Sequence, residues 1–567
     1  MGTGRNLSRV DSHGVSRTRA RSTLGSQLQI ALGVTLGVTL VDAFIVALVA
    51  ATSACSAESY SQRAEHEALR LLEERDAAVL GTREANARQP KSLPPPSPDA
   101  GAPADPAHTE EPPPAPAPLL LDLRQALATA YHGSRQMIDR REDLENDALA
   151  LLDTRHSFAP QLALALSYLF DDGTNGVPDQ NTAGADFRFD QILSTGARFR
   201  LDASTSASAS IDDSAGYDSL VSLTLAQPLL RGGGYDITHE PLIQAERNLV
   251  YAIREYELFR EDFSIDVARR FYDLVNRKQS IDNQQRNLDN NEFGRRQAEA
   301  LFAVGRANEL DVLRARRSEL TARNTLLEAR ESLHLALDSF RIFLGLPDDQ
   351  EIDVVSDPPV FTPVAYEIRS AVAVAQENRL DLLNRKEQLE DAERGVSLAR
   401  NSLLPDLDVT LGASYLTDTT GTLGGSDLER SDASLGVTFG VPLDRVRERN
   451  AYRSAELSLS RARRSLEEFE DQLRVSIQSS FRELERRLQS LEIQRQLIVD
   501  QTKNLRIAEL RFERGELPNR DVVEANQSLL DAQNALIDEQ VSYEIERLQL
   551  LRDLGILFVG EDGMWKR

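Results

Sequence analysis

Apolar residues recur every three or four positions along most of this chain, which is the spacing of one face of an α-helix. The pattern predicts helices from about residue 121 to 158 and from 238 to 304, and the second segment has one proline, Pro241, near its start. At 1.5 Å per residue, residues 238–304 would form roughly 100 Å of helix, far beyond the globular mean of about 12 residues. In the second half, heptad-like spacing predicts packing along narrow coiled-coil seams, as at Phe481, Leu484, Leu488 and Leu491.

After Pro160, and again after Pro405, the period of the pattern changes from 3.6 to two. Apolar residues then alternate with small or polar ones in four segments: residues 162–168, 221–225, 407–415 and 435–441. Alternating segments of about 9–11 residues are typical of membrane β-barrels. A half-buried soluble sheet shows the same alternation, but the length of the helices and an apparent export signal favour the barrel.

A further alternating segment, residues 183–211, lies between the first two predicted strands. Phe187 and Phe189 are spaced by two, as are Phe199 and Leu201, and the segment has no counterpart in the second half. We interpret it as an extra hairpin or a long external loop.

The second half of the chain repeats the first. Residues 245–346 return at 455–556 with a constant offset of 210 and no gap. Before the strands the offset is 245, as between Pro160 and Pro405. We therefore expect two copies of one unit, each made of helices, a strand pair, and two very long helices joined by a tight turn.

Composition excludes several classes of function. The formal net charge of −25 argues against nucleic acid, whose phosphates need basic patches. The seven His are scattered and there is one Cys, so we expect no metal site. The glycine-rich segments 231–234 and 421–425 lack the strand–loop–helix context of a phosphate cradle and are interpreted as loops. We find no catalytic constellation, and expect neither an enzyme nor a cofactor.

Residues 1–54 are typical of an export signal, with basic residues before an apolar stretch from Leu28 to Ala50. The sequence Thr52-Ser53-Ala54-Cys55 resembles the lipobox of bacterial lipoproteins, in which the Cys becomes the acylated first residue, although Thr52 stands where Leu or Val is usual. Ordinary cleavage and an uncleaved membrane anchor are the alternatives. Residues 55–118 would follow as a lipid-anchored linker, extended where prolines concentrate after residue 90.

The order of these signals resembles the outer membrane efflux protein family over residues 119–558. The resemblance rests on the prolines before the strands, on Gln227-Pro228-Leu229, and on Arg379-Leu380-Asp381-Leu382. Above all it rests on the motif Phe-x-x-Gly-x-x-x-x-x-Asp-Val-x-x-Ala, which begins at Phe302 and again at Phe512.

The family's fold implies a mainly α-helical chain with membrane β-strands. Long antiparallel coiled-coil helices would accompany four main strands per chain, and three chains would close a 12-stranded barrel that continues as a periplasmic α-helical tunnel. Residues 119–350 and 360–567 would be the two repeats of this duct.

The same resemblance implies the outer-membrane exit channel of a tripartite efflux or type I secretion system in a Gram-negative-type cell, reaching into the periplasm. Its partners would be two more copies of the chain in a homotrimer, outer-membrane lipid, a periplasmic adaptor (membrane fusion) protein, and an inner-membrane pump or ABC transporter. The alternative is a lipid-anchored coiled-coil scaffold without a conducting pore, which the duplicated strand pairs disfavour.

The family also implies a pore constriction at acidic residues after the second turn, here Asp521 and Glu524, and by repetition Asp311. Three copies of each carboxylate would form rings of like charge. Structural roles are the alternative: Asp311 and Asp521 suit the positive end of a helix, and Glu524 is spaced to pair with Arg520. The Arg that helps to latch the closed end in the family is Leu517 here.

The two tight turns contain Gly305, Arg306, Gly515 and Pro518. By resemblance they would dock on the helical hairpin of the adaptor. Alternatively, the glycines only end helices, because glycine accepts the left-handed conformation, and Pro518 only suits a first helical turn.

Overall fold

The computed structural model describes residues 57–79, 118–171, 180–210, 216–356, 368–420, 430–514 and 516–565. The chain divides into two compact units, Met1–Arg70 and Leu71–Arg567. Helix α2 (Ala57–Val79) begins in the first unit, and every other element belongs to the second. The predicted leader, Cys55 and most of the proline-rich linker lie outside the described residues.

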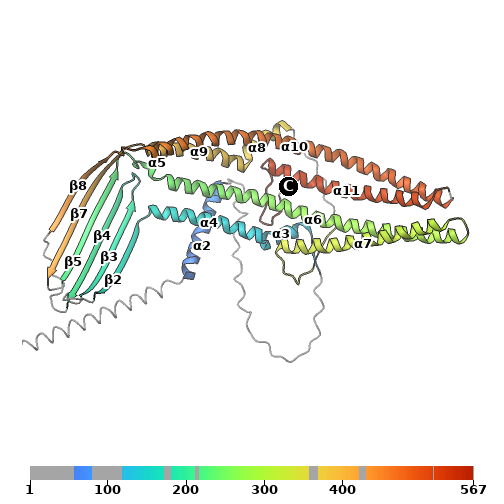
Figure 1. Ribbon diagram of the computed structural model, residues 1–567, viewed down its shortest axis with the longest axis horizontal. Helices are drawn as coiled ribbons and strands as arrows, with labels where there is room; N and C mark the ends of the chain where they lie inside the picture. Colours follow the sequence, from blue (N-terminus) through green and yellow to red (C-terminus); the bar gives the residue numbers. More distant parts are fainter. Residues whose placement is uncertain are drawn as a thin grey trace, which may run out of the picture. The chain divides into compact units, whose positions relative to one another are not determined.

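Four very long helices form two antiparallel pairs (Figure 1). Helix α6 (Glu240–Ala303) is followed by α7 (Glu309–Leu344), and α10 (Val446–Glu513) by α11 (Asn519–Asp553). Helices α6 and α10 have 64 and 68 residues, so the prediction of one continuous helix over residues 238–304 is confirmed. The other helices are α3 (Leu123–Gly133), α4 (Arg135–Phe158), α5 (Tyr235–Thr238), α8 (Ile368–Asn378) and α9 (Leu380–Asn401).

Six strands form one antiparallel sheet in the order β2-β3-β4-β5-β7-β8 (Figure 1). Their bounds are β2 (Gln161–Asp171), β3 (Gln180–Ile192), β4 (Arg198–Ser210), β5 (Gly216–Pro228), β7 (Asp406–Thr420) and β8 (Arg430–Gly440). A separate parallel pair joins β1 (Leu119–Leu121) to β6 (Ile352–Val354).

The four predicted main strands are confirmed as β2, β5, β7 and β8, and the sheet contains two further strands, β3 and β4. Residues 183–210 form most of β3 and β4, so the extra segment is a hairpin within the sheet and not an external loop. Its alternation is in phase with that of both neighbouring strands, so pairing satisfies its backbone groups and keeps like side chains on one face.

Two large apolar cores lie among the described helices. The first lies mainly around α3, α6 and α7 and contains Phe263, Phe271 and Phe340, and it also contains Ile545 and Leu548 of α11. The second, formed by α8 to α11, contains Ile477 and Leu550. Helix α6 also packs against α11, so the two repeats join side by side through one helix of each long pair.

The Arg379-Leu380-Asp381-Leu382 motif ties the short helices of the second repeat to α11. Arg379, between α8 and α9, lies 2.8 Å from the Asp381 carboxylate and 3.6 Å from that of Asp553. Burial raises the pKa of the Asp553 carboxyl, and the nearby Arg552 and Arg379 oppose that rise. Arg379 of the motif therefore places a positive charge near the largely buried carboxylate of Asp553 at the end of α11.

Gly345→Ala is expected to lower the apparent Tm strongly, at a cost of about 3 kcal/mol or more. Gly345 ends α7 with φ 76°, and an added Cβ would lie 1.8 Å from the Gly133 carbonyl oxygen. The matched control is Gly305→Ala, with φ 72° and open space around the added atom, which should cost only about 1–2 kcal/mol. Thermal melting followed by circular dichroism compares the two; equal shifts would contradict the role of the close contact.

Candidate channel wall, docking turns and constriction

One face of the six-stranded sheet is apolar and exposed. On the edge strand β2, Leu162 and Leu164 are 68% and 69% exposed, and on the opposite edge strand β8, Leu435 and Val437 are 70% and 65% exposed. Within the described residues, β2 and β8 each pair with a strand on one side only. A single chain therefore leaves both an apolar surface and two rows of backbone hydrogen-bonding groups without partners.

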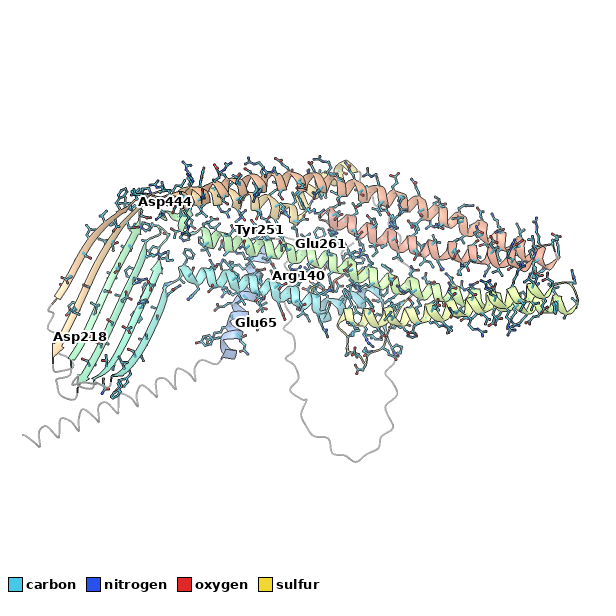
Figure 2. All side chains as sticks on the ribbon, in the orientation of Figure 1. Glu65, Arg140, Asp218, Tyr251, Glu261 and Asp444 are labelled. Carbon is cyan, nitrogen blue, oxygen red and sulfur yellow. The ribbon has the colours of Figure 1, made fainter. Side chains whose placement is uncertain are left out.

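The two ends of the strands differ in what adjoins them, because only one end leads into the helices. Figure 2 labels Asp218 on β5 at the end far from the helices and Asp444 where β8 passes into α10. Four strands, β2, β5, β7 and β8, connect directly to the helical part of the chain, whereas β3 and β4 connect only to other strands.

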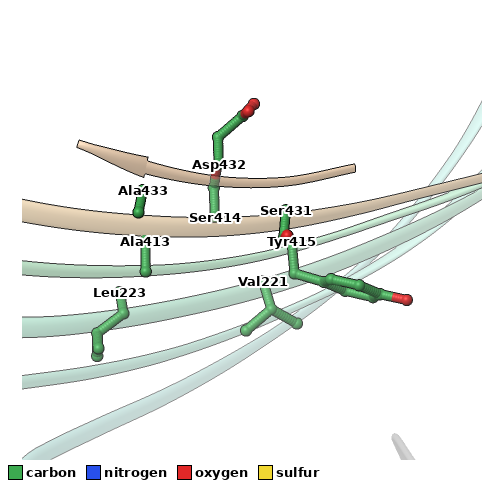
Figure 3. Close-up of a pocket in the computed structure, with 8 residues that line it drawn as sticks. All are labelled: Val221, Leu223, Ala413, Ser414, Tyr415, Ser431, Asp432 and Ala433. Carbon is green, nitrogen blue, oxygen red and sulfur yellow. The ribbon is translucent and has the colours of Figure 1, made fainter. Parts of the chain in front are cut away.

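A shallow depression on the sheet lies over β5, β7 and β8 (Figure 3). Val221, Leu223, Ala413 and Tyr415 contribute to it from the apolar face, and Asp432 points away from them. The depression is open and mainly apolar, so we treat it as part of the exposed apolar face.

The first candidate docking turn connects α6 to α7. The Gly305 N–H donates to the Phe302 carbonyl oxygen at 2.9 Å, and the Arg306 N–H to that of Leu301 at 2.8 Å. These bonds satisfy carbonyl groups at the end of α6, so Gly305 is a helix terminator as well as a docking candidate. Both Gly305 and Arg306 are exposed.

The second candidate docking turn connects α10 to α11 and has a similar start. The Glu516 N–H donates to the Arg511 carbonyl oxygen at 2.9 Å. Pro518 then occupies the position before the first turn of α11, where its carbonyl oxygen accepts from the Asp521 N–H at 3.1 Å. Gly515 lies outside the described residues.

Asp311 has a defined structural partner. The Asp311 N–H donates to Asn308 Oδ1 at 2.8 Å, and the Asp311 carboxylate accepts from the Asn308 N–H at 3.5 Å. This reciprocal arrangement is a capping box at the start of α7. The cap explains an acidic residue at position 311 without any role in a pore.

Asp521 and Glu524 lie one turn apart on α11, and α11 has no such box. Arg520 lies 3.2 Å from the Asp521 carboxylate, so the alternative pairing of Arg520 with Glu524 is not the one found. Glu524 is exposed, and no ion pair joins its carboxylate to another residue in the described part of the chain. Glu524 therefore presents its carboxylate to solvent in the single chain.

A row of amide side chains joins the two long pairs next to these carboxylates. Asn526 on α11 donates to Asn287 on α6 at 2.7 Å and accepts from Asn290 at 3.1 Å. Farther along, Asn283 donates to Asn534 at 2.7 Å. We call these five residues the amide seam. The amide seam is not among the features predicted from the sequence. Its signal is the spacing of Asn283, Asn287 and Asn290 by four, three and seven positions on a coiled-coil helix.

None of the helices in the described ranges is long and apolar enough to cross a membrane. Within those ranges, no group of three or more His, Cys, Asp or Glu side chains could hold a metal ion.

The sequence matches the profile of the outer membrane efflux protein family over residues 183–346 and 371–555. These ranges cover more than half of the chain. The chain therefore belongs to the outer membrane efflux protein family.

Individual relatives are distant in sequence. The outer membrane protein TolC of Escherichia coli K12 is 23% identical over 273 residues, which is 45% of this chain and 54% of TolC. The match thus spans about half the length of that relative.

Solved structures share the fold over a larger range. The outer membrane protein VceC of Vibrio cholerae has a TM-score of 0.58 at 18% identity, covering 76% of this chain and 96% of VceC. The outer membrane channel CmeC of Campylobacter jejuni has a TM-score of 0.57 at 17% identity, covering 76% and 85%.

Proposed function

We propose that three copies of this chain form a passive exit channel in the outer membrane that continues into the periplasm, as part of a tripartite efflux or type I secretion system. The single observation that carries the proposal is the exposed apolar face of a sheet whose two edges are unpaired. In lipid, such a sheet is stable only when its edges close against other strands. A coiled-coil scaffold has no use for this surface.

The geometry of the sheet supports closure by identical chains. Adjacent strands are antiparallel throughout, and their number is even, so β2 and β8 run in opposite directions. The β8 edge of one chain can therefore pair with the β2 edge of the next in the same antiparallel manner, and repetition closes a ring.

The helical part of each chain also has two outer helices that can pack against those of neighbouring chains. Helix α6 packs against α7 and α11, and α10 packs against the other side of α11, so α7 and α10 are the outer helices of the two long pairs. Along α7, apolar residues at spacings of seven or eight are more than half exposed; this apolar stripe consists of Leu313, Leu320, Leu327, Leu335 and Ile342. We propose that the stripe packs against α10 of the neighbouring chain, where Val475, Ile493 and Ile507 are also exposed.

At the periplasmic end, Asp521 and Glu524 would form the constriction. Three copies of both carboxylates around a narrow opening attract cations and repel one another, and low dielectric in the wall strengthens both effects. We assign Asp311 to its helix cap. Opening would part the two long pairs at the amide seam, where water can replace each hydrogen bond at a net cost of about 0.5–1.5 kcal/mol.

The turns at Gly305, Arg306, Gly515 and Pro518 would dock on a periplasmic adaptor, which couples the channel to an inner-membrane pump or ABC transporter. Acylation of Cys55 would add a lipid anchor. The channel itself performs no chemical reaction, so it needs neither a catalytic group nor a cofactor.

Conductance distinguishes the channel from a scaffold. The purified chain, reconstituted in planar bilayers, should give discrete single-channel steps and should run as a heat-modifiable trimer from outer-membrane fractions. A stable monomer that conducts nothing would overturn the proposal.

Leu320→Asp combined with Leu327→Asp should prevent trimer formation. Burial of each leucine contributes about 1.5–3 kcal/mol to assembly. The substitutions remove this contribution and bury unpaired carboxylates in every interface, which is unfavourable. Leu320→Met with Leu327→Met is the matched control and should retain trimers, because volume and apolar character are kept. Light scattering in detergent measures the assembly; intact trimers in the Asp variant would place the stripe outside the interface.

A further inference from the structure

The hairpin formed by β3 and β4 (residues 180–210), which we call the inserted hairpin, distinguishes the first repeat from the second. The offset between the repeats is 245 residues before the strands and 210 after them, so the first repeat has 35 additional residues. In the second repeat β7 pairs directly with β8, whereas in the first the inserted hairpin separates β2 from β5.

The inserted hairpin is a full part of the sheet. Its strands have 13 residues each and pair residue for residue from Gln180 with Ser210 to Ile192 with Arg198. β3 pairs along the whole of β2, and β4 pairs with β5 from Arg198 to Ser208. A loop resting on the outside of a barrel would have no such ladders on both sides.

The two faces of the inserted hairpin continue those of the other strands. One row of paired residues crosses all six strands and is apolar throughout: Leu162, Phe189, Leu201, Leu223, Ala413 and Ala433. The next row falls on the other face and is small or polar: Ala163, Arg188, Asp202, Ser222, Ser414 and Asp432.

Two ion pairs lie on the polar face of the inserted hairpin. Arg188 Nε is 2.8 Å from Asp202, and Arg200 Nε is 2.7 Å from Asp190. Four charged side chains on one face are strongly unfavourable against lipid and ordinary against water. In the proposed channel this face would line the aqueous lumen, and the face with Phe189 and Leu201 would meet lipid.

The turn of the inserted hairpin is held at the helical end of the sheet. Gln227 accepts a hydrogen bond from the Thr195 hydroxyl at 2.7 Å and donates one to the Thr195 carbonyl oxygen at 3.1 Å. The Gly234 N–H donates to the same carbonyl oxygen at 3.1 Å. The turn is thus fastened to the segment that leads from β5 into α5, which keeps both inserted strands in line with the rest.

We infer that the assembled barrel has 18 strands, six from each chain, in place of the 12 expected from the family resemblance. The inference rests on the proposed trimeric channel. With strands 4.7 Å apart and tilted by 40°, 18 strands give a backbone radius of about 18 Å, against about 12 Å for 12 strands. The wider lumen carries three copies of both Arg–Asp pairs, so it suits large hydrophilic cargo, and the helical end alone limits cargo size.

Electron cryomicroscopy of the full-length trimer in lipid nanodiscs tests the strand number. We expect 18 strands in the barrel wall. A trimer with 12 wall strands and residues 180–210 outside the wall overturns this inference alone. A chain that stays monomeric in lipid overturns the proposed channel and this inference with it, so the two failures are distinguishable.

Cysteine labelling tests the two faces of β4 in the same protein. Ser204→Cys lies on the lumen face and its neighbour Ala203→Cys on the lipid face. A charged thiol reagent should modify Ser204→Cys at least ~10-fold faster, because it does not enter hydrocarbon. Wild type, whose one Cys is Cys55, measures the background. Equal modification rates at the two positions would show that the inserted hairpin is not part of the barrel wall.

Discussion

Replacing Asp521 and Glu524 together by alanine is expected to raise single-channel conductance severalfold and to abolish block by multivalent cations. In a trimer the double substitution removes six carboxylates from the proposed constriction. Without these carboxylates, cations lose the site that holds them, so the block disappears. The smaller alanine side chains widen the passage, and we expect this to outweigh the closer approach of the helices that weaker repulsion allows. Planar bilayer recordings with and without added divalent cations measure both effects.

The matched control removes the same number of carboxylates from an outer helix. Glu492 and Asp500 are exposed on α10, and each lies near a basic residue four positions away or less. Glu492→Ala with Asp500→Ala should leave conductance and cation block unchanged. If the Asp521 and Glu524 variant behaves like this control, the two residues serve only the start of α11.

Gly305→Trp combined with Gly515→Trp is expected to abolish export while trimers remain intact. An indole at each turn would obstruct a close-fitting helical partner. Gly305 is exposed and an added Cβ would have nothing within 4 Å, so we expect a cost of about 1–2 kcal/mol from local backbone strain. Export is measured in cells that carry the cognate adaptor and pump, and trimers by heat-modifiable mobility.

Gly395→Trp provides the control for bulk alone. Gly395 lies within α9, away from both turns, and has nothing within 4 Å of an added Cβ. We expect normal export from this variant. Normal export from the double turn variant as well would show that the glycines only end helices.

Local pattern determined most of the elements. The helix from 238 to 304 and the four strands found as β2, β5, β7 and β8 follow from the spacing of apolar residues, because each element places its own side chains at fixed intervals. The cap at Asn308 follows from the same local logic, since Asp311 stands three residues later and reaches back.

Contacts between segments that are far apart in the sequence were harder to predict. Alternation in residues 183–211 fits a hairpin and an extended loop equally, and only the presence of β2 and β5 on either side decides between them. Arg520 could reach either Asp521 or Glu524, and the turn geometry brings it to Asp521. The amide seam depends on the register between α6 and α11, which are more than two hundred residues apart in sequence.

By itself, the sequence determined the long helices and the amphipathic strands and predicted that they form two repeats, because periodicity and duplication are properties of the chain alone. Only the tertiary structure decided that six strands share one sheet, and that the carboxylates at Asp311 and Glu524 differ in what surrounds them. The physical reason is that a hydrogen-bond ladder or an ion pair needs two partners, and the chain's path in space selects the second.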